Sequence, residues 1–275
     1  MNLLKWYRVG RRLGAGNEVL TRAYNAFGTV RNVVRYGNPD MPVDVTIETS
    51  TFCNRKCYYC PNSKHETPVE FMRSDVFEKT IADLVAMRFC GRIMWNFYNE
   101  PLLDPSLLRR IVYAKARLPQ CYHMVFTNGD ALNEPVVQRF IAAGVNCFVV
   151  TNHNIPESIA AVDHDLRMGW LAAQYGKHIR IRPPIHNRHS AKAGLIPSGE
   201  PMHGECAVVR MPIVTITGDV LLCCNDYMRK HVFGNVMEKP LLEIWQDVEY
   251  DHVRRQLRKG NLPRAICKRC YGEEA

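Results

Sequence analysis

Three cysteines near the start of the chain have a spacing that suits part of an iron-sulfur cluster. Cys53, Cys57 and Cys60 form the pattern C-x3-C-x2-C. Three thiolates can hold three irons of a four-iron cubane, which leaves the fourth iron open to another ligand. Structural zinc takes four ligands, and no fourth candidate lies close to this triple in the sequence. The spacing therefore predicts a catalytic cluster with an open iron.

Four further cysteines lie in the last third of the chain, namely Cys206, Cys223, Cys267 and Cys270. Four thiolates close a cluster completely, so such a cluster has no open position. The same number of thiols would also suit structural zinc. In the company of the first triple we favour a second, auxiliary iron-sulfur cluster. Cys224 could substitute as a ligand, donate a hydrogen atom or simply pack.

Polar residues gather in three short motifs between these two groups. The motifs are Tyr98-Asn99-Glu100-Pro101, Thr127-Asn128-Gly129-Asp130 and Thr151-Asn152-His153. Glu100 could accept a charge-assisted hydrogen bond from an ammonium group. Turn formation alone would also explain Asn128 followed by Gly129. The motifs are therefore candidate contacts to a small polar cofactor.

A segment without helical or strand periodicity, residues 183–206, offers candidate bases. It contains Arg188, Lys192 and three histidines, His186, His189 and His203. Long loops inside a compact domain are often functional. Histidine or a desolvated lysine can act as a base near neutral pH. We single out Lys192 and Arg188, with Cys224, as candidate catalytic residues.

The elements that must position these residues alternate regularly. Strand-like runs at residues 44–48, 93–98, 122–126, 147–150 and 179–181 are separated by helical patterns. This alternation predicts an α/β fold with parallel strands, in which functional residues gather at the carboxyl ends of the strands. The cysteine triple and each of the three polar motifs follow such a run. Ser74 and Asp104 are expected to cap helices, and Pro156 is expected to start one.

The chain divides into three predicted parts. Residues 1–42 are rich in arginine and apolar side chains and suit a basic helical extension. Residues 43–205 would form the α/β domain with the long loop. Residues 206–275 would form a small module, with a β-hairpin at residues 214–222 and a helix at residues 241–257.

The first triple, with aromatic Tyr59 before its third cysteine, resembles the signature of the radical S-adenosylmethionine (SAM) superfamily. The resemblance implies a partial TIM-like barrel and a four-iron cluster whose open iron binds SAM. It also implies cleavage of SAM to a 5′-deoxyadenosyl radical that removes a hydrogen atom from the substrate. The implied SAM contacts are Tyr59, Asn99, Glu100, Thr127, Asn128 and Asn152.

The C-terminal part resembles the auxiliary-cluster modules called SPASM and its shortened form, Twitch. Gly218-Asp219-Val220, Cys223, Gly234-Asn235-Val236 and Leu242-Glu243-Ile244-Trp245 occur in the usual order of that module. The whole layout is similar to that of the 2-deoxy-scyllo-inosamine dehydrogenases of antibiotic biosynthesis. That likeness implies oxidation of a secondary alcohol of an aminocyclitol. Lys192 stands where those enzymes carry a basic arginine.

Three alternatives remain open at this point. An epimerase of a similar substrate would use a thiol, such as that of Cys224, to return hydrogen. A ribosomal-peptide maturase is less favoured, because no leader-binding domain is visible. A non-catalytic metal-binding or electron-transfer protein would leave the open-iron triple and Glu100 unexplained.

Composition limits the partners and the location. The formal net charge is +9, and the 11 cysteines are an odd number without a secretory signal pattern. We expect a cytoplasmic protein without a membrane span, acting on a small, carbohydrate-like molecule. A flavodoxin or ferredoxin would supply electrons. Nucleic acid is not favoured, since no base-stacking motif or basic stripe stands out.

Overall fold

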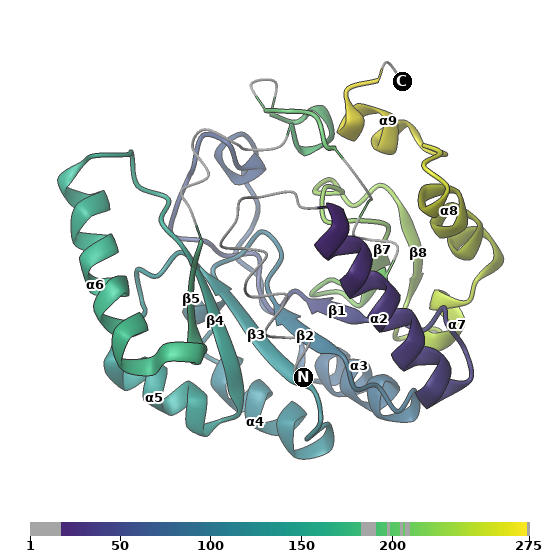
Figure 1. The fold of residues 1–275 in the computed structure, drawn as a ribbon, viewed down its shortest axis with the longest axis horizontal. Helices are drawn as coiled ribbons and strands as arrows, with labels where there is room; N and C mark the ends of the chain where they lie inside the picture. The colour runs from purple at the N-terminus through teal and green to yellow at the C-terminus, as the bar shows by residue number, and fades with distance from the viewer. Residues whose placement is uncertain (1–17, 183–190, 197–198, 204–205, 207–209, 274–275) are drawn as a thin grey trace.

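One eight-stranded sheet organises the computed structural model, which describes residues 18–182, 191–196, 199–203, 206 and 210–273. Its strand order is β5-β4-β3-β2-β1-β6-β7-β8 (Figure 1). Strands β1 to β6 run parallel to one another, β7 is antiparallel to β6, and β8 is antiparallel to β7. The strands are β1 (Asp44–Ile47), β2 (Arg92–Trp95), β3 (Tyr122–Thr127), β4 (Val145–Thr151), β5 (Ile179–Arg182), β6 (Ile213–Val214), β7 (Asp219–Leu221) and β8 (Val232–Asn235).

Four helices cover the outer face of the parallel strands. They are α3 (Ser74–Ala86), α4 (Leu107–Arg117), α5 (Glu134–Ala142) and α6 (Ile159–Tyr175). Figure 1 shows them along the bottom and left of the sheet. Short 3-10 helices lie at η1 (Pro61–Ser63), η2 (Pro101–Leu103), η3 (Gly176–His178) and η4 (Lys192–Gly194). This βα alternation is the predicted α/β partial barrel.

Side-chain alternation along the strands explains the layers. Ile47, Trp95 and Phe148 point towards the helices and are fully buried in the main core. Met124 and Val149 point to the other face, where a separate small cluster forms inside the barrel. Successive side chains of a strand face opposite sides, so every second side chain points into the barrel, where it is available to contact a substrate or cofactor.

Three predicted helix starts differ from the structure. Asp104 caps no helix; its carboxylate accepts from the amide of Ser106 and pairs with the buried Arg110 guanidinium at 3.1 Å. Helix α4 therefore begins three residues later, at Leu107. Helix α6 begins at Ile159, after a cap by Ser158, and not at Pro156. Ser74 is the first residue of α3, and the cap position belongs to Arg73, whose side chain makes no capping hydrogen bond.

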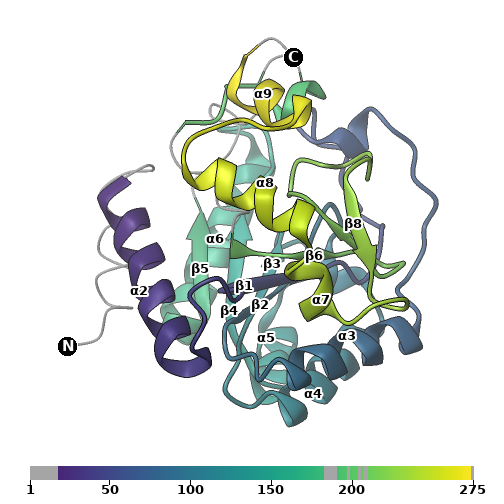
Figure 2. The same cartoon turned by 90° about the vertical axis from the view of Figure 1, so that its right-hand side faces the viewer.

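The C-terminal strands extend the same sheet. Strand β6 pairs with β1, in the register of Thr46 with Ile213 and Ile47 with Val214. Gly218, with a φ of +90°, makes the turn from β6 to β7. Helices α7 (Leu241–Trp245) and α8 (Val248–Arg258) lie over these strands, and α9 (Ala265–Tyr271) follows (Figure 2). The predicted helix at residues 241–257 is thus broken, because Asp247 caps α8.

The N-terminal part contains the helix α2 (Glu18–Tyr36). The buried Asn32 fixes it to the chain that follows, since its side-chain amide donates to the carbonyl of Met41 at 2.6 Å. Arg210, just before β6, donates to the hydroxyl of Thr29 at 2.8 Å. Among the described residues no helix is long and apolar enough to cross a membrane.

Candidate active site

The loop that carries the first three cysteines follows β1 and is fixed to two neighbouring strand ends. The Arg55 guanidinium donates to the carboxylate of Asp130, after β3, and to Asn154, after β4. Asn54 donates to the same carboxylate at 2.8 Å. A planar guanidinium bound in this way has little freedom. The cysteine loop is therefore held against the carboxyl ends of β3 and β4.

Glu100 lies buried at the end of β2, next to this loop. Its carboxylate accepts from the Thr127 hydroxyl and from the amide of Asn128, both at 2.7 Å, and from the amide of Leu102 at 3.1 Å. Burial raises the pKa of Glu100 to about 7, and these hydrogen bonds oppose the shift. Its charge is close enough to Cys53 to affect that thiol. The structure thus brings three predicted SAM contacts to the cysteine loop.

The other predicted SAM contacts are placed differently. Asn99 accepts from the amide of Phe97 at 2.9 Å and donates to Ser50 at 3.2 Å. Tyr59 is buried, and its hydroxyl bonds to Nδ1 of His153. Asn152 donates to Ala161 and Asp165, and its oxygen accepts from Asn154. The Asn152 side chain therefore holds the turn between β4 and α6, and its contact with SAM stays a prediction.

The first three thiols form a donor set that suits a cluster. Burial raises the pKa of Cys53 to about 11, and the nearby Cys57 and Cys60 raise it further. Thiols that raise each other's pKa are close neighbours, and binding to iron would relieve this by stabilising the thiolates. In the described part of the chain, no three His, Cys, Asp or Glu side chains are grouped tightly enough for one metal ion. The donor set, three soft sulfur ligands on one loop, fits an iron-sulfur cluster with an open position.

The four C-terminal cysteines form two pairs beside the sheet, Cys206 with Cys223 and Cys267 with Cys270, and Cys224 lies near a member of each pair. Burial raises the pKa of Cys223, and the neighbouring Cys224 and Cys206 raise it further. Burial also raises the pKa of Cys270. Asn225 opposes the shift through a 3.0 Å contact, and the nearby Cys224 and Cys267 add to it. A loop, the strand end after β7 and helix α9 thus supply the four predicted ligands. This donor set fits a closed cluster.

Tyr98 and Lys192 lie between the two groups of cysteines. The Tyr98 hydroxyl donates to the carbonyl of Cys224 at 2.8 Å, and Lys192 Nζ lies 5.9 Å from the Tyr98 ring centroid. Burial raises the pKa of both Cys60 and Cys270, and the ammonium of Lys192 opposes both shifts. Lys192 is therefore near one thiol of each group.

The backbone around Lys192 is strained. Lys192 and Ala193 have φ values of +48° and +54°, in the left-handed region that residues with a side chain seldom adopt. The carbonyl of Ala193 accepts from Arg269 on α9, which also carries Cys267 and Cys270. Strain of this kind persists only when the surroundings impose it. Arg188, His186 and His189 lie outside the described residues.

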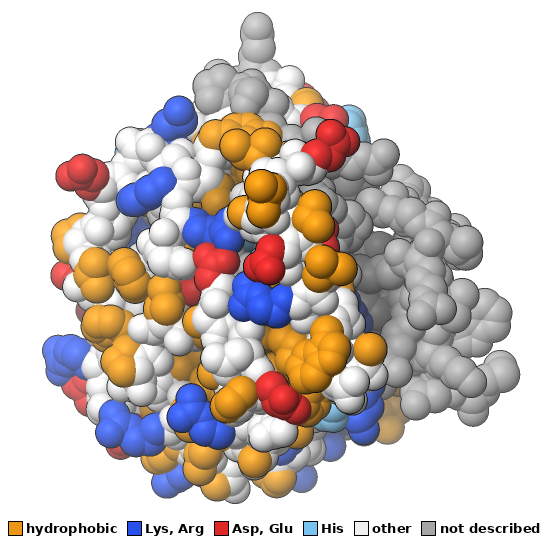
Figure 3. Space-filling view, turned by 90° about the vertical axis from the view of Figure 1, so that its left-hand side faces the viewer, with side chains coloured by type: hydrophobic (Ala, Val, Ile, Leu, Met, Phe, Trp, Pro, Cys, Tyr) orange, Lys and Arg blue, Asp and Glu red, His pale blue; other side chains and the backbone are white. Residues whose placement is uncertain are grey.

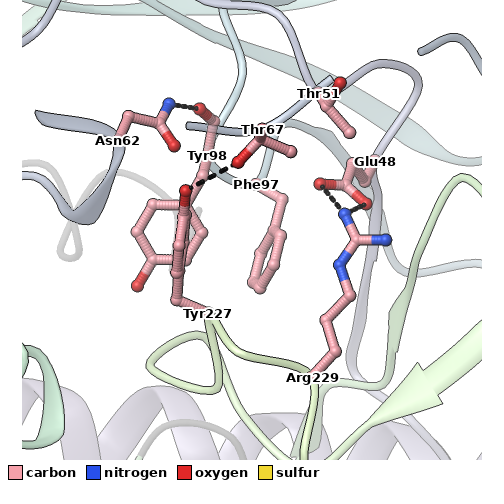
Figure 4. Close-up of a pocket in the computed structure, with 8 residues that line it drawn as sticks. All are labelled: Glu48, Thr51, Asn62, Thr67, Phe97, Tyr98, Tyr227 and Arg229. Carbon is pink, nitrogen blue, oxygen red and sulfur yellow. Dashed lines mark hydrogen bonds and ion pairs between the residues drawn. The ribbon is translucent and has the colours of Figure 1, made fainter. Parts of the chain in front are cut away.

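A small pocket opens beside Tyr98 (Figure 4). One wall is the ion pair of Glu48 and Arg229, in which a guanidinium nitrogen donates to the two carboxylate oxygens at 3.0 Å and 2.9 Å. Opposite it, the Thr67 and Tyr227 hydroxyls bond at 2.9 Å, and the Tyr227 ring packs edge-on against Tyr98 at 4.8 Å. The lining residues are Glu48, Thr51, Asn62, Thr67, Phe97, Tyr98, Tyr227 and Arg229. Hydroxyl, amide and aromatic groups thus share one wall.

The buried Glu48 makes the stability of the protein depend on pH. Burial raises its pKa from 4.5 to about 7, although Arg229 and the amide of Ile216 oppose the shift. A folded pKa above the unfolded value stabilises the fold below pH 4.5, and this stabilisation is lost as pH rises through 7. We expect the free energy of unfolding to fall by about 3 kcal/mol over this window from this group.

The check is urea unfolding of the wild type and Glu48→Gln at a series of pH values. Glu48→Gln should flatten the profile between pH 4.5 and pH 7. Glu70→Gln, at an exposed glutamate, is the control and should keep the wild-type slope. Equal slopes for wild type and Glu48→Gln would contradict the assignment.

Several residues of this region were not predicted from the sequence. Arg229 and Tyr227 reach the barrel from the segment between β7 and β8. Arg182 ends β5 and places its guanidinium 5.0 Å from the ring centroid of Phe126. The alternation of β5 was the one signal available for Arg182, since it puts that side chain on the face opposite the core residue Ile179.

Comparison with known proteins gives this geometry a family. The model of the radical SAM superfamily matches residues 47–162, and that of the SPASM iron-sulfur cluster-binding domain matches residues 206–271. The SAM-dependent 2-deoxy-scyllo-inosamine dehydrogenase of Niallia circulans is 29% identical over 234 residues, 82% of this chain and 91% of that protein.

Solved structures agree. The structure of BtrN in complex with AdoMet and 2-DOIA has a TM-score of 0.75 at 27% identity, covering 83% of this chain and 92% of BtrN. BtrN in an open conformation has a TM-score of 0.65 at 27% identity, covering 84% and 92%. The tagged anSMEcpe with bound AdoMet shares the fold, with a TM-score of 0.54 at 14% identity, covering 77% and 79%.

These matches settle two of the predictions. They identify an oxidoreductase-type enzyme, which excludes the non-catalytic alternative. They also imply one iron-sulfur cluster that binds SAM and one auxiliary cluster. The chain therefore carries a radical SAM domain at residues 47–162 and a C-terminal SPASM iron-sulfur cluster-binding domain at residues 206–271.

Proposed function

We propose that this enzyme oxidises a secondary alcohol of an aminocyclitol, or of a similar sugar-like molecule, to a ketone. The observation that carries the proposal is the likeness to the 2-deoxy-scyllo-inosamine dehydrogenase across nearly its whole length, both cysteine groups included. We extend the proposal to antibiotic biosynthesis, as the resemblance noted in the sequence implies. We place the work of the enzyme in the cytoplasm, with a flavodoxin- or ferredoxin-type donor supplying electrons.

The proposal divides the chain at residues 42 and 205. Cys53, Cys57 and Cys60 would hold the SAM-binding four-iron cluster, and the four C-terminal cysteines would hold the auxiliary one. When bound, these groups supply a 5′-deoxyadenosyl radical that removes the carbinol hydrogen, and an acceptor for the remaining electron. The residues of the chain must then bind the substrate, orient it and take the hydroxyl proton.

Residues around Glu100 are suited to holding SAM. The buried carboxylate can accept from the amino group of methionine, in place of one of its present donors. Asn99, Thr127, Asn128 and Tyr59 surround the same edge of the sheet. We keep Asn152 in this set as the residue that shapes the turn after β4.

Lys192 is our candidate for the base that takes the hydroxyl proton. It lies near Tyr98, with its ammonium close to one thiol of each cysteine group. A substrate between the two groups would therefore be within its reach. Arg188 remains a second candidate from the sequence, and Arg182 is a third from its position at the end of β5.

The pocket beside Tyr98 supports a polyhydroxylated substrate. Sugar-like rings present an apolar face and a rim of hydroxyl groups, which aromatic walls and fixed polar groups complement. Phe97 and Tyr98 supply the rings, and Thr51, Asn62 and Thr67 supply hydroxyl and amide groups. The carboxylate of Glu48 is the acidic group of this pocket and would suit an amino substituent.

The test is an anaerobic assay of the fully reconstituted enzyme with a panel of aminocyclitols, beginning with 2-deoxy-scyllo-inosamine deuterated at the carbinol carbon. We expect deuterium in 5′-deoxyadenosine and one ketone for each SAM cleaved. Lys192→Met should lower the rate of ketone formation by about 100-fold, the usual contribution of a general base, and leave SAM affinity unchanged. Lys177→Met, at an exposed lysine after α6, is the matched control.

Each outcome of this assay decides something. Deuterium transfer without a ketone would overturn the dehydrogenase proposal and retain the radical chemistry. Ketone formation at the wild-type rate in Lys192→Met would exclude Lys192 as the base. Partial recovery in Lys192→Arg, at raised pH, would distinguish proton transfer from loop disruption.

An epimerase is the second candidate, because Cys224 is exposed next to the Tyr98 hydroxyl, where a thiol could return hydrogen. An epimerase would release a stereoisomer that contains solvent deuterium, and Cys224→Ala would abolish that product. A dehydrogenase would release the ketone, and Cys224→Ala would still form it.

A further inference from the structure

The outer face of α6 exposes a row of large apolar side chains. We call Ile155, Ile159, Val162, Leu166 and Trp170 the α6 stripe. Their exposed fractions are 74%, 90%, 52%, 71% and 49%. A monomeric protein seldom leaves five large apolar side chains in one continuous row in contact with water.

The spacing of the stripe is helical and regular. The four members in the helix, Ile159, Val162, Leu166 and Trp170, follow each other at intervals of three, four and four residues, so they share one side of α6. Ile155 lies in the segment just before the helix and is also exposed. The opposite side of α6, with Ala161, Met168 and Leu171, is already buried against the sheet. A helix that is apolar on two sides needs a second surface to cover the outer one.

The stripe lies on an accessible face of the molecule. Figure 1 shows α6 as the outermost helix on the left, and Figure 3 looks onto this face, where apolar side chains form a column between single charged groups. Gly169 and Ala173 also lie on this side and have the smallest side chains. A Cβ atom at Gly169 would meet no neighbouring atom within 4 Å, so another helix can approach closely there.

The area available matches what a dimer needs. Five such side chains, exposed by one half to nine tenths, offer roughly 700 Å² per copy, and two copies would bury roughly 1,400 Å² in total. Stable protein interfaces begin at about 1,200 Å². If these side chains were wholly covered, the stripe would therefore reach the lower limit of a stable interface.

We propose that α6 is the interface of a homodimer, in which the α6 stripes of two copies pack antiparallel about a two-fold axis. A surface that covers itself must be related by such an axis. Asp163 and Arg167 lie on one flank of the stripe, four residues apart. In an antiparallel pair the same flanks meet, so Asp163 of one copy would face Arg167 of the other. One guanidinium nitrogen of Arg167 already donates to the carbonyls of Asp130 and Leu132 in its own chain, at 3.4 Å and 3.2 Å, so an ion pair across the interface would use the remaining N–H groups. The carboxylate of Asp163 beside the stripe would be repelled by an anionic membrane, which disfavours that occupant.

The inner side of α6 links this interface to the proposed SAM site. His164 Nε2 lies 2.7 Å from the carbonyl of Asn128, and Asp165 accepts from Asn152 at 2.8 Å. A dimer would hold α6 from outside and so limit the motion of both loops. The dimer itself does not depend on the proposed reaction.

The test is sedimentation velocity of the full-length, reconstituted protein at tens of micromolar. We expect a dimer for the wild type and a monomer for Leu166→Glu. Val112→Glu, on α4 and 51% exposed, is the matched control and should remain dimeric. Iron content and circular dichroism of Leu166→Glu should equal those of the wild type, which shows that the variant folds.

Three results would overturn the proposal. The wild type could sediment as a monomer at every concentration. Leu166→Glu could remain a dimer, which would place the interface elsewhere. The monomeric wild type could bind vesicles of neutral or anionic phospholipid through the stripe, which would make a lipid surface the occupant.

Discussion

Cys57→Ala is expected to lower the formation of 5′-deoxyadenosine by roughly a thousand-fold or more, because two thiolates cannot hold three irons of the SAM-binding cluster. The measurement is anaerobic reconstitution with iron and sulfide, reduction in the presence of SAM, and quantification of 5′-deoxyadenosine. Wild type should contain about eight irons per chain, and the variant about four. Cys57 is only partly buried, so the substitution should leave the fold intact.

The control for this experiment is Cys90→Ala. Cys90 is also partly buried, and its sulfur lies 3.1 Å from the Tyr36 hydroxyl, on the side of the barrel where α2 packs. It should keep both the iron content and the activity of the wild type. If Cys57→Ala formed deoxyadenosine at the rate of Cys90→Ala, the assignment of the first cysteine group would fail.

Cys223→Ala is expected to separate SAM cleavage from product formation. Loss of one of four thiolates should remove the auxiliary cluster and leave about four irons per chain. Cleavage of SAM should continue, since the first cysteine group is intact. Ketone formation should fall by roughly 100-fold or more, because the remaining electron then has no acceptor in the protein. The two measurements are iron content and the ratio of ketone to deoxyadenosine.

The neighbouring Cys224→Ala is the matched comparison for iron content. The two cysteines are adjacent: Cys206 raises the pKa of Cys223, and Cys224 raises the pKa of Cys270. The expectation for Cys224 rests on the resemblance of the C-terminal part to the SPASM module, in which Cys223 takes the ligand position. Cys224→Ala should therefore retain about eight irons. The reverse result, four irons in Cys224→Ala and eight in Cys223→Ala, would show that Cys224 is the cluster ligand and Cys223 is not.

Residues that follow strands were predictable, because sequence pattern fixes where parallel strands end. The strand at β2 ends just before the motif with Glu100, and β3 ends at Thr127, so both had to lie at one edge of the sheet. The roles of side chains at that edge were harder to predict. Asn152 matched a motif, yet its amide groups are used by the turn that carries it.

Contacts between distant segments were not predictable. Arg55 forms an ion pair with Asp130, which lies 75 residues later, and Glu48 forms one with Arg229, which lies 181 residues later. No periodicity connects such positions, since each pairing depends on the final packing of several elements. Local competition explains the errors at helix starts. Asp104 is a residue type that often caps helices, but here its carboxylate forms an ion pair with the nearby Arg110.

The pairing of β6 with β1 has a consequence for exchanging parts between related enzymes. Strand β6 covers the backbone edge of β1, and β1 leads directly into the first cysteine loop. A chain cut before residue 206 would leave the amides and carbonyls of β1 open to pairing with another chain, and so prone to aggregation. A chimera that transplants the C-terminal part must therefore carry β6 in register with its new neighbour. The two parts of the chain share one sheet at their junction, so neither is expected to fold as an independent unit.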